Sequence, residues 1–390
     1  MSRSSTVTLS RMRKVVFGSP AASTLAKMAG HAGAHRILIM ASGTLRRKTA
    51  EIANIQNALG NRVVAIVDGI PAHSPRSAVI SATAVAKQAE ADLIITVGGG
   101  SVTDAGKAVR LCLANDIEES AALDALRLRK GAKGAARPPA CKPPAIAQIA
   151  VPTTLSAGEF SAIAGLTDER NRTKDLFWHP DMVPTAVVLD PAITRHTPED
   201  LFLSTGVRAI DHCVEGICSP RSHPYADAQA LRGLALLAAG LPRTKEDPED
   251  LDARLDCLLG AWLSMAPVTC GVPMGASHGI GYVLGAAHGV AHGHTSCVML
   301  PAVLRWNRPA NANRQAEVAA ALGAPGAAPD SLLETLIARL GLPSRLSTVG
   351  ITPQHFPYIA EQAMDTPWVP CNPRPIRGPE DVQEILAMAA

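Results

Sequence analysis

Short apolar runs recur through the first half of the chain, and Gly, Ser or Asp follows each run closely. The runs are residues 15–17, 36–40, 63–67, 93–97, 146–151 and 186–189. Strands that are buried on both faces are apolar at nearly every position, and these runs are also rich in β-branched residues. Helical stretches such as residues 77–91 lie between them. This alternation predicts an α/β fold with a parallel sheet covered by helices on both faces.

The pattern changes beyond about residue 196. Residues 231–241, 251–265 and 332–340 are apolar at helical spacing, with Pro and Gly at the breaks, and no strand alternation is evident. We therefore predict two domains, an α/β domain over residues 1–192 and an all-α domain over residues 193–390, with a hinge near Asp190. A cleft between two such domains is the default position of a binding site.

A glycine loop follows the fourth apolar run. Gly98, Gly99, Gly100 and Ser101 precede a predicted helix, so backbone N–H groups and the helix N-terminus could hold a phosphate. The loop is neither a Walker A loop nor a GxGxxG motif, because Thr103 stands at the third glycine of the latter. We predict a pyrophosphate cradle, with a plain glycine turn as the alternative.

Hydroxyl side chains follow the fifth apolar run. Thr153 and Thr154 come directly after Pro152. Such hydroxyls could cap a helix, or they could line a nucleotide, and the sequence leaves both interpretations open. A basic Gly/Pro-rich stretch, residues 127–144, precedes this run and is interpreted as a solvated loop, with a phosphate-binding loop as the alternative.

Composition excludes several classes of function. The net charge is +3, from 37 basic and 34 acidic residues, and aromatic residues make up only 3%, which disfavours nucleic-acid binding. The eight cysteines form no CxxC pair and are expected to be reduced and buried in a cytosolic protein. No apolar run approaches the ~18 residues of a membrane span. Residues 1–6 are expected to form a short disordered leader of a cytoplasmic protein, although they weakly resemble an organellar transit peptide.

Three histidines of the second half have the spacing of a metal site, apart from one position. His212 lies in a predicted helix, and His278 and His292 bracket a glycine-rich segment. Position 208 lies one helical turn before His212, where a carboxylate would complete a site of one oxygen and three nitrogens. Arg208 stands there instead, and a guanidinium cannot bind a metal. Three imidazoles alone can bind zinc, so iron or zinc at these histidines stays open.

These motifs, taken in order, resemble the iron-containing alcohol dehydrogenase family over almost the whole chain. They are the glycine loop with Asp104 and Lys107, the Pro152–Thr154 segment with Gly158 and Glu159, and the histidine segments. The resemblance implies a Rossmann-like nucleotide-binding domain, an all-α C-terminal domain, a dehydroquinate synthase-like architecture, NAD(P) in the cleft and a homodimer. It further implies a set of residues that hold or border the cofactor: Ser42, Gly98, Gly99, Gly100, Ser101, Asp104, Thr153 and Thr154.

Within the family the maleylacetate reductase branch is the most similar. The similar stretches are His212–Glu215, the C-terminal Asn372–Ile376 and, in general character, Phe160–Asp168. In metal-dependent relatives position 208 carries an aspartate ligand, and a further histidine often stands where Tyr282 does. No acid follows the second apolar run at Ser42, so the resemblance leaves both NADH and NADPH open.

The resemblance leads to a hypothesis of NAD(P)H-dependent reduction of an acidic unsaturated keto acid, maleylacetate to 3-oxoadipate, in the degradation of aromatic compounds. Arg208 would bind a carboxylate or enolate through its fork, and His212, His278 and His292 would donate protons and hydrogen bonds. Tyr282 is a substitute proton donor or a packed aromatic.

Three alternatives accompany this hypothesis. The chain could be an iron- or zinc-dependent alcohol or aldehyde dehydrogenase, or a nucleotide-binding protein without catalytic activity. Arg208 could instead be an ion-paired arginine whose partner is Asp211 or Glu215.

Overall fold

The computed structural model describes residues 6–130, 136–171 and 173–390. Two compact units make up the chain. One spans Ser10–Thr197, and the other spans Pro198–Ala390 together with the N-terminal segment up to Leu9. Most of the predicted leader and residues 131–135 of the basic stretch lie outside the described residues.

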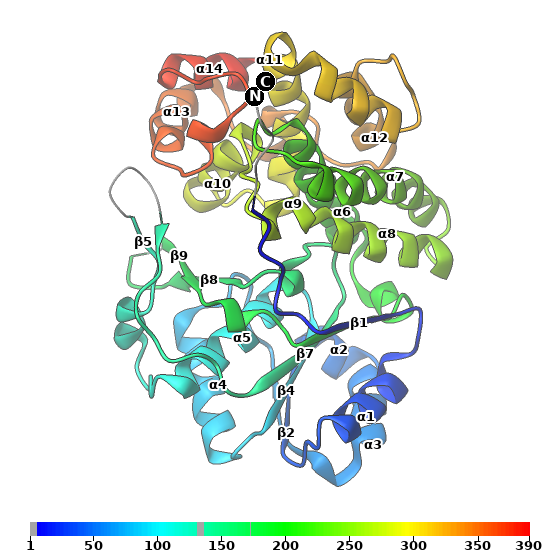
Figure 1. The fold of residues 1–390 in the computed structure, drawn as a ribbon, viewed down its shortest axis with the longest axis vertical. Helices are drawn as coiled ribbons and strands as arrows, with labels where there is room; N and C mark the ends of the chain where they lie inside the picture. The colour runs from blue at the N-terminus through cyan, green and yellow to red at the C-terminus, as the bar shows by residue number, and fades with distance from the viewer. Residues whose placement is uncertain (1–5, 131–135, 172) are drawn as a thin grey trace. The chain divides into compact units, whose positions relative to one another are not determined.

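The first unit is built on a six-stranded parallel sheet (Figure 1). In spatial order its strands are β1 (Lys14–Phe17), β10 (Ala186–Leu189), β7 (Ala147–Pro152), β4 (Leu93–Gly98), β2 (Ile37–Ala41) and β3 (Val63–Asp68). All six predicted runs are strands, and the predicted parallel sheet is confirmed.

Alternate residues of each strand build the two faces of this sheet, because successive side chains of a strand point to opposite sides. Leu38 and Met40 of β2 pack with helices α4 (Arg76–Gln88) and α5 (Gly100–Ala114). Ile37 and Ile39 pack with α1 (Ala21–His31), α2 (Gly43–Lys48) and α3 (Glu51–Leu59). Each such side chain stabilises the fold by about 1.5–3 kcal/mol when buried, so both faces carry a core.

The connections of the sheet diverge between β2 and β4. From β2 the chain continues to β3, its neighbour towards one edge of the sheet. From β4 it continues through α5 to β7, the neighbour of β4 towards the opposite edge. Open parallel sheets bind ligands at such a point, outside the carboxyl ends of the strands. In this unit those ends are Ser42 after β2 and the glycine loop after β4.

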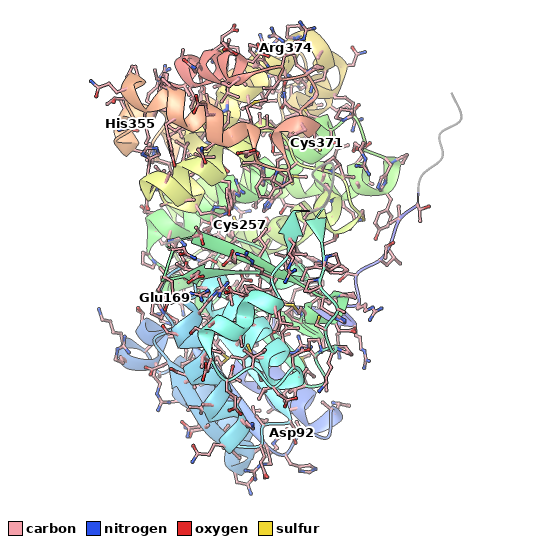
Figure 2. The ribbon with its side chains drawn as sticks, turned by 90° about the vertical axis from the view of Figure 1, so that its left-hand side faces the viewer. Asp92, Glu169, Cys257, His355, Cys371 and Arg374 are labelled. Atoms are coloured by element: carbon pink, nitrogen blue, oxygen red, sulfur yellow. The ribbon has the colours of Figure 1, made fainter. Side chains whose placement is uncertain are left out.

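An antiparallel hairpin, which the sequence did not predict, follows β7. Its strands are β8 (Ile163–Asp168) and β9 (Thr173–Trp178). Glu169, labelled in Figure 2, accepts hydrogen bonds from the backbone N–H groups of Arg76 and Ser77 and so holds the turn of the hairpin against the start of α4. A second, shorter pair, β5 (Arg129–Lys130) and β6 (Ala136–Arg137), lies within the basic stretch.

The second unit contains only helices among its described residues, as predicted. They are α6 (Glu199–Cys218), α7 (Pro224–Glu246), α8 (Leu251–Ser264), α9 (Ala266–Thr269), α10 (Ala276–His288), α11 (His292–Ala321), α12 (Pro329–Arg339), α13 (Phe356–Met364) and α14 (Pro379–Met388). Helix α6 is buried from Phe202 to Cys218 and packs against α7, α8 and α11, so it forms the centre of this unit. No helix in the described ranges has the length and apolar character needed to cross a membrane.

Short 3₁₀ helices connect these elements. They are η1 (Gly60–Arg62), η2 (Ser120–Ala125), η4 (Gly158–Phe160), η5 (Pro180–Met182), η6 (Ile193–His196), η7 (Leu346–Val349), η8 (Pro353–His355) and η9 (Val369–Cys371). All eight cysteines are free. Five of them are buried, as expected, whereas Cys141, Cys270 and Cys371 are partly buried.

Candidate functional site

Helix α6 places Arg208 and His212 one turn apart, as their spacing predicts. Both side chains are buried, and so is that of His278 from α10. The imidazole rings of His212 and His278 have centroids 5.0 Å apart. The structure therefore brings together two of the three predicted histidines and the predicted arginine.

The Arg208 guanidinium is held by one of its nitrogens. Nη1 donates to Oγ of Ser296 at 3.0 Å and lies 3.4 Å from Oδ2 of Asp211, while the buried Nε atom has no hydrogen-bond partner among the described residues. Burial lowers the pKa of Arg208, and the charges of Asp211 and Glu215 act in the opposite direction. A buried cation with an unsatisfied donor can bind an anion or a polarised oxygen.

Asp211 is the counter-charge of Arg208. It is fully buried, and its Oδ2 atom accepts hydrogen bonds from Ser277 Oγ at 2.8 Å and Ser296 Oγ at 2.6 Å. Burial raises the pKa of Asp211, and the nearby His278 and Arg208 lower it. Asp211 thus links α6 to α10 and α11 and fixes the serine that holds Arg208.

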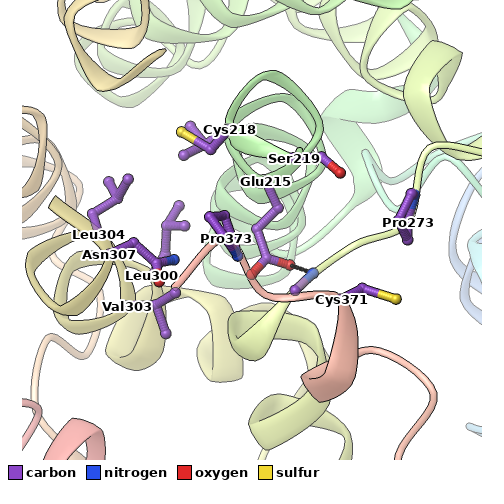
Figure 3. Close-up of a pocket in the computed structure, with 12 residues that line it drawn as sticks. Glu215, Cys218, Ser219, Pro273, Leu300, Val303, Leu304, Asn307, Cys371 and Pro373 are labelled. Atoms are coloured by element: carbon purple, nitrogen blue, oxygen red, sulfur yellow. Dashed lines mark hydrogen bonds between the residues drawn. The ribbon is translucent and has the colours of Figure 1, made fainter. Parts of the chain in front are cut away.

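Glu215 organises the start of α10. Its carboxylate accepts the backbone N–H groups of Gly275 at 2.9 Å and Ser277 at 2.8 Å. Figure 3 labels Glu215 and marks with a dashed line a hydrogen bond that its carboxylate accepts. A Cβ atom at Gly275 would lie 3.0 Å from Glu215 Oε1, so a glycine there permits this close approach. Oε2 of Glu215 also lies 2.7 Å from Nδ1 of His278. One buried carboxylate therefore caps a helix and orients an imidazole.

His278 is neutral in this environment. Burial is the main reason that its pKa is lowered to about 3, and Arg208 lowers it further. With Nδ1–H donated to Glu215, the lone pair of the neutral ring lies on Nε2, which is buried and has no partner among the described residues. Burial and the neighbouring His278 also hold the pKa of His212 well below its usual value.

Tyr282 and His292 lie differently. Tyr282 stands one turn after His278 in α10, is partly buried, and has its ring 5.5 Å from that of Trp368. His292 is exposed and is the first residue of α11. Their predicted catalytic roles stay predictions.

The candidate metal ligands of the described residues form a different set from the predicted one. Ligand atoms of Asp211, Glu215 and His278 lie within 4.8 Å of one another. Glu215 already accepts several N–H groups, and the guanidinium of Arg208 is 3.4 Å from Asp211. A dication near this guanidinium would meet a repulsion of about 4 kcal/mol per unit charge at 4 Å and intermediate dielectric. The guanidinium of Arg208 therefore disfavours a divalent ion beside Asp211.

The glycine loop of the first unit has the predicted strand–turn–helix form. Gly98 ends β4, and α5 begins at Gly100. A Cβ atom at Gly99 would lie 3.1 Å from Cγ2 of Thr154, and one at Gly100 would lie 3.0 Å from Oγ of Ser156. The loop after β7 therefore packs directly on the glycine loop, and larger residues would push the two apart.

Asp104 and Lys107 hold the structure beneath this loop. Lys107 is fully buried, and its Nζ donates to Oδ1 of Asp104 at 2.8 Å and to the carbonyls of Gly158 and Ile163 at 2.7 Å each. Oδ2 of Asp104 accepts the Gly165 N–H at 3.0 Å. Both oxygens of Asp104 thus have partners in the protein, and its predicted contact with a cofactor stays a prediction.

The remaining predicted cofactor residues surround the same loop. Ser42 donates its N–H to the carbonyl of Val97, and Oγ of Ser101 accepts the N–H of His73. The carbonyl of Thr153 accepts the hydroxyl of Thr197. The helix-cap interpretation of the threonines is wrong, because the segment leads into the short η4, which has no side-chain cap.

Sequence reasoning missed the serines of the buried network. Ser277 and Ser296 belong to α10 and α11, and nothing in their local sequence marks them. It did name Asp211 as a possible ion-pair partner of Arg208, and the structure contains that pair.

The C-terminal motif supports α10 from another side. Oδ1 of Asn372 accepts the Ala276 N–H, and the Arg374 guanidinium lies 3.5 Å from the centroid of the Trp306 ring. This motif therefore acts through packing and capping.

Comparison with known proteins agrees with this architecture. The model of the iron-containing alcohol dehydrogenase domain matches residues 12–191, and that of the family's C-terminal domain matches residues 202–390. Dehydrogenase FUM7 of Gibberella moniliformis is 36% identical over 413 residues, which covers 96% of each chain. Maleylacetate reductase 1 of Cupriavidus pinatubonensis is 28% identical and covers 97% of this chain and 94% of its own.

A solved structure has the same fold. Maleylacetate reductase from Agrobacterium tumefaciens superposes with a TM-score of 0.83 at 25% identity, covering 100% of this chain and 98% of that one. Matches to both family domains and a relative above 30% identity over nearly the full length are consistent with the parallel sheet, the glycine loop and the helical unit described above. The chain is therefore an oxidoreductase that belongs to the iron-containing alcohol dehydrogenase family.

Proposed function

We propose that this oxidoreductase uses NADH or NADPH to reduce an acidic, unsaturated keto acid of the maleylacetate type. The substrate class comes from similarity to maleylacetate reductases, two of which are 28% and 29% identical to this chain. The relatives also include the dehydrogenases FUM7 and ALT3, whose names give no substrate. The chemistry of the buried site therefore carries the choice of substrate.

The observation that supports an acidic substrate is the state of Arg208. Its guanidinium is anchored through Nη1 to Ser296, and its Nε donor is buried without a partner. A carboxylate or an enolate oxygen would satisfy that donor. A simple alcohol brings no charge to this position, so it would leave the cation as it is.

The proposed reaction adds a hydride and a proton across a double bond conjugated to a carbonyl. A bound reduced nicotinamide would supply the hydride, and negative charge would then develop on the carbonyl oxygen as an enolate. Arg208 stabilises that charge, in the place where a metal would act as a Lewis acid. The proton that completes the product would pass through His212 and His278, whose rings have centroids 5.0 Å apart and whose Nδ1 and Nε2 atoms, respectively, are buried without a partner among the described residues.

The direct test is NAD(P)H oxidation by the purified protein with maleylacetate, compared with a series of simple alcohols and aldehydes. Turnover of maleylacetate alone supports the proposal. Turnover of simple alcohols or aldehydes alone favours a conventional alcohol or aldehyde dehydrogenase. Dinucleotide binding without any turnover favours a protein that has lost catalysis.

Two further measurements test whether Arg208, and not a metal ion, polarises the carbonyl and whether Arg208 binds the acidic substrate. Stoichiometric iron or zinc in protein purified without chelator would overturn the proposal that Arg208 is the group that stabilises the charge on the carbonyl oxygen. Arg208→Asp is expected to lower kcat/KM for a dicarboxylate by at least about 100-fold, because it removes a charge-assisted contact and adds a repulsive one. Dinucleotide binding by the same variant is the control, because the glycine loop belongs to the other unit.

A further inference from the structure

A guanidinium fills the space of an absent side chain at the carboxyl end of β2. Arg47 belongs to α2, and its Nη2 atom lies 2.5 Å from the place that a Cβ atom of Gly43 would take. Its Nη1 atom donates to Oδ2 of Asp68, the last residue of β3, at 3.1 Å. The same atom lies 3.9 Å from the Cβ position of Gly69. The guanidinium therefore lies across the ends of β2 and β3.

This position borders the glycine loop. Ser42, which precedes Gly43, donates its N–H to the carbonyl of Val97 at 2.8 Å, and its Cβ lies 3.4 Å from the Cβ position of Gly98. The carboxyl ends of β2 and β4 are also the point where the connections of the sheet diverge. A dinucleotide with its pyrophosphate on the glycine loop has its adenosine ribose at the neighbouring strand end in folds of this kind.

The charges at this strand end favour an anion. Arg46, Arg47 and Lys48 follow one another at the end of α2, and among the described residues Asp68 is their one acidic ion-pair partner. Ser42 directly follows β2, so no carboxylate stands where a ribose 2′-hydroxyl is commonly bound. An arginine fork matches a phosphate in two parallel hydrogen bonds, which a hydroxyl cannot accept in the same way.

We propose that Arg47 selects NADPH over NADH by binding the 2′-phosphate, and that Gly43 and Asp68 are positioning residues for its guanidinium. Gly43 leaves the space in which the guanidinium lies, and Asp68 fixes its direction while leaving Nη2 available. The Arg47 side chain is 66% exposed, so a ligand in solution can reach it. An exposed ion pair stabilises a fold little and does not require glycine at position 43. The inference rests on the proposed function only in requiring a nicotinamide dinucleotide.

Calorimetric titration of the full chain with NADP⁺ and with NAD⁺, in the absence of substrate, tests the proposal. NADP⁺ is expected to bind at least about tenfold more tightly, which corresponds to one good charge-assisted hydrogen bond. Arg47→Gln should weaken NADP⁺ binding about 10- to 100-fold and change NAD⁺ binding by less than about threefold. Arg46→Gln removes the same charge from the neighbouring residue and is the matched control.

Gly43→Ala tests the position of the Arg47 guanidinium, because it moves that group without changing its charge. The new methyl group forces Nη2 away from its place, because it would come within 2.5 Å, whereas the net charge stays the same. NADP⁺ binding should weaken at least about threefold, without a matching change for NAD⁺. The midpoint of thermal unfolding, measured for each variant, shows whether the fold is intact.

The possible outcomes are distinct. Equal affinity of the unmodified protein for the two dinucleotides overturns the inference, and so do equal losses in Arg47→Gln and Arg46→Gln. Absence of binding to either dinucleotide overturns the proposed function together with the inference. NADP⁺ selectivity that depends on Arg47 supports the inference even if maleylacetate is not reduced, in which case the proposed substrate alone is wrong.

Discussion

Glu215 and His278 form the closest acid–imidazole contact of the buried site, with 2.7 Å between Oε2 and Nδ1. The same carboxylate accepts the backbone N–H groups at the start of α10. The orientation of the imidazole and the position of its helix therefore depend on one side chain of α6. Figure 3 shows that Glu215 also lines an adjoining pocket with apolar residues of α11, among them Leu300 and Val303.

Glu215→Gln should disrupt this arrangement, because an amide presents one acceptor oxygen and a second group that can only donate. Buried N–H groups of α10 then lose an acceptor, and we expect the free energy of unfolding to fall by about 2–4 kcal/mol. Urea unfolding measures the loss. Glu361→Gln, on the exposed side of α13, is the matched control and should change it by less than about 0.5 kcal/mol. Similar values for the two variants would contradict the assigned role.

Arg208 and Asp211 should be coupled energetically. Asp211→Asn leaves a buried guanidinium without its counter-charge, and Arg208→Met leaves a buried carboxylate without its own. Each single variant should lose about 3 kcal/mol, whereas the double variant should lose less than the sum by about 1–3 kcal/mol. A double-mutant cycle in urea measures this difference. Strict additivity would show that the two charges do not stabilise each other.

Lys107 should act on stability rather than on phosphate binding. Its ammonium group is fully buried and uses its hydrogens on Asp104, Gly158 and Ile163. Lys107→Met should therefore lower the free energy of unfolding by about 2–4 kcal/mol. Lys87→Met, at an exposed ion pair of α4, is the control and should cost less than about 1 kcal/mol. Equal stability of the two variants would contradict this structural role of Lys107.

Glu159 should make the stability of the protein depend on pH. Burial raises its pKa to about 7, although Lys107 acts in the opposite direction. The folded state therefore binds more protons than the unfolded state between about pH 4.5 and 7, and stability from this group falls as pH rises through that window. At pH 8 the free energy of unfolding of Glu159→Gln should be about 1–3 kcal/mol larger than that of the unmodified protein, and at pH 4.5 the two should differ little. Urea unfolding at both pH values checks this, and a pH-independent difference would contradict it.

Much of the fold could be predicted from the sequence, because a strand buried on both faces must be apolar along its length. The six runs of the first half meet that condition, and all six are strands of one sheet. The hairpin β8–β9 was missed. Its strands include Asp168, Lys174 and Asp175, which form ion pairs or backbone contacts that only the folded chain supplies.

The candidate site could also be predicted only in part from the sequence. Helical spacing alone placed Arg208 and His212 on one face of a helix, since residues four apart are neighbours on its surface. Sequence also supplied the glycine loop, where a Cβ atom at Gly99 or Gly100 would make an unusually tight contact with the segment after β7.

Only the tertiary structure decided which polar atoms are satisfied and which are left open. Ser296, 88 residues from Arg208, holds one side of the guanidinium, and Glu215 holds His278 from another helix. Hydrogen bonds and desolvation depend on distances between segments far apart in the chain, and these distances exist only after the helices pack. The sequence by itself determined which chemical groups this protein has, whereas packing decided that Arg208 is a buried cation with a free donor.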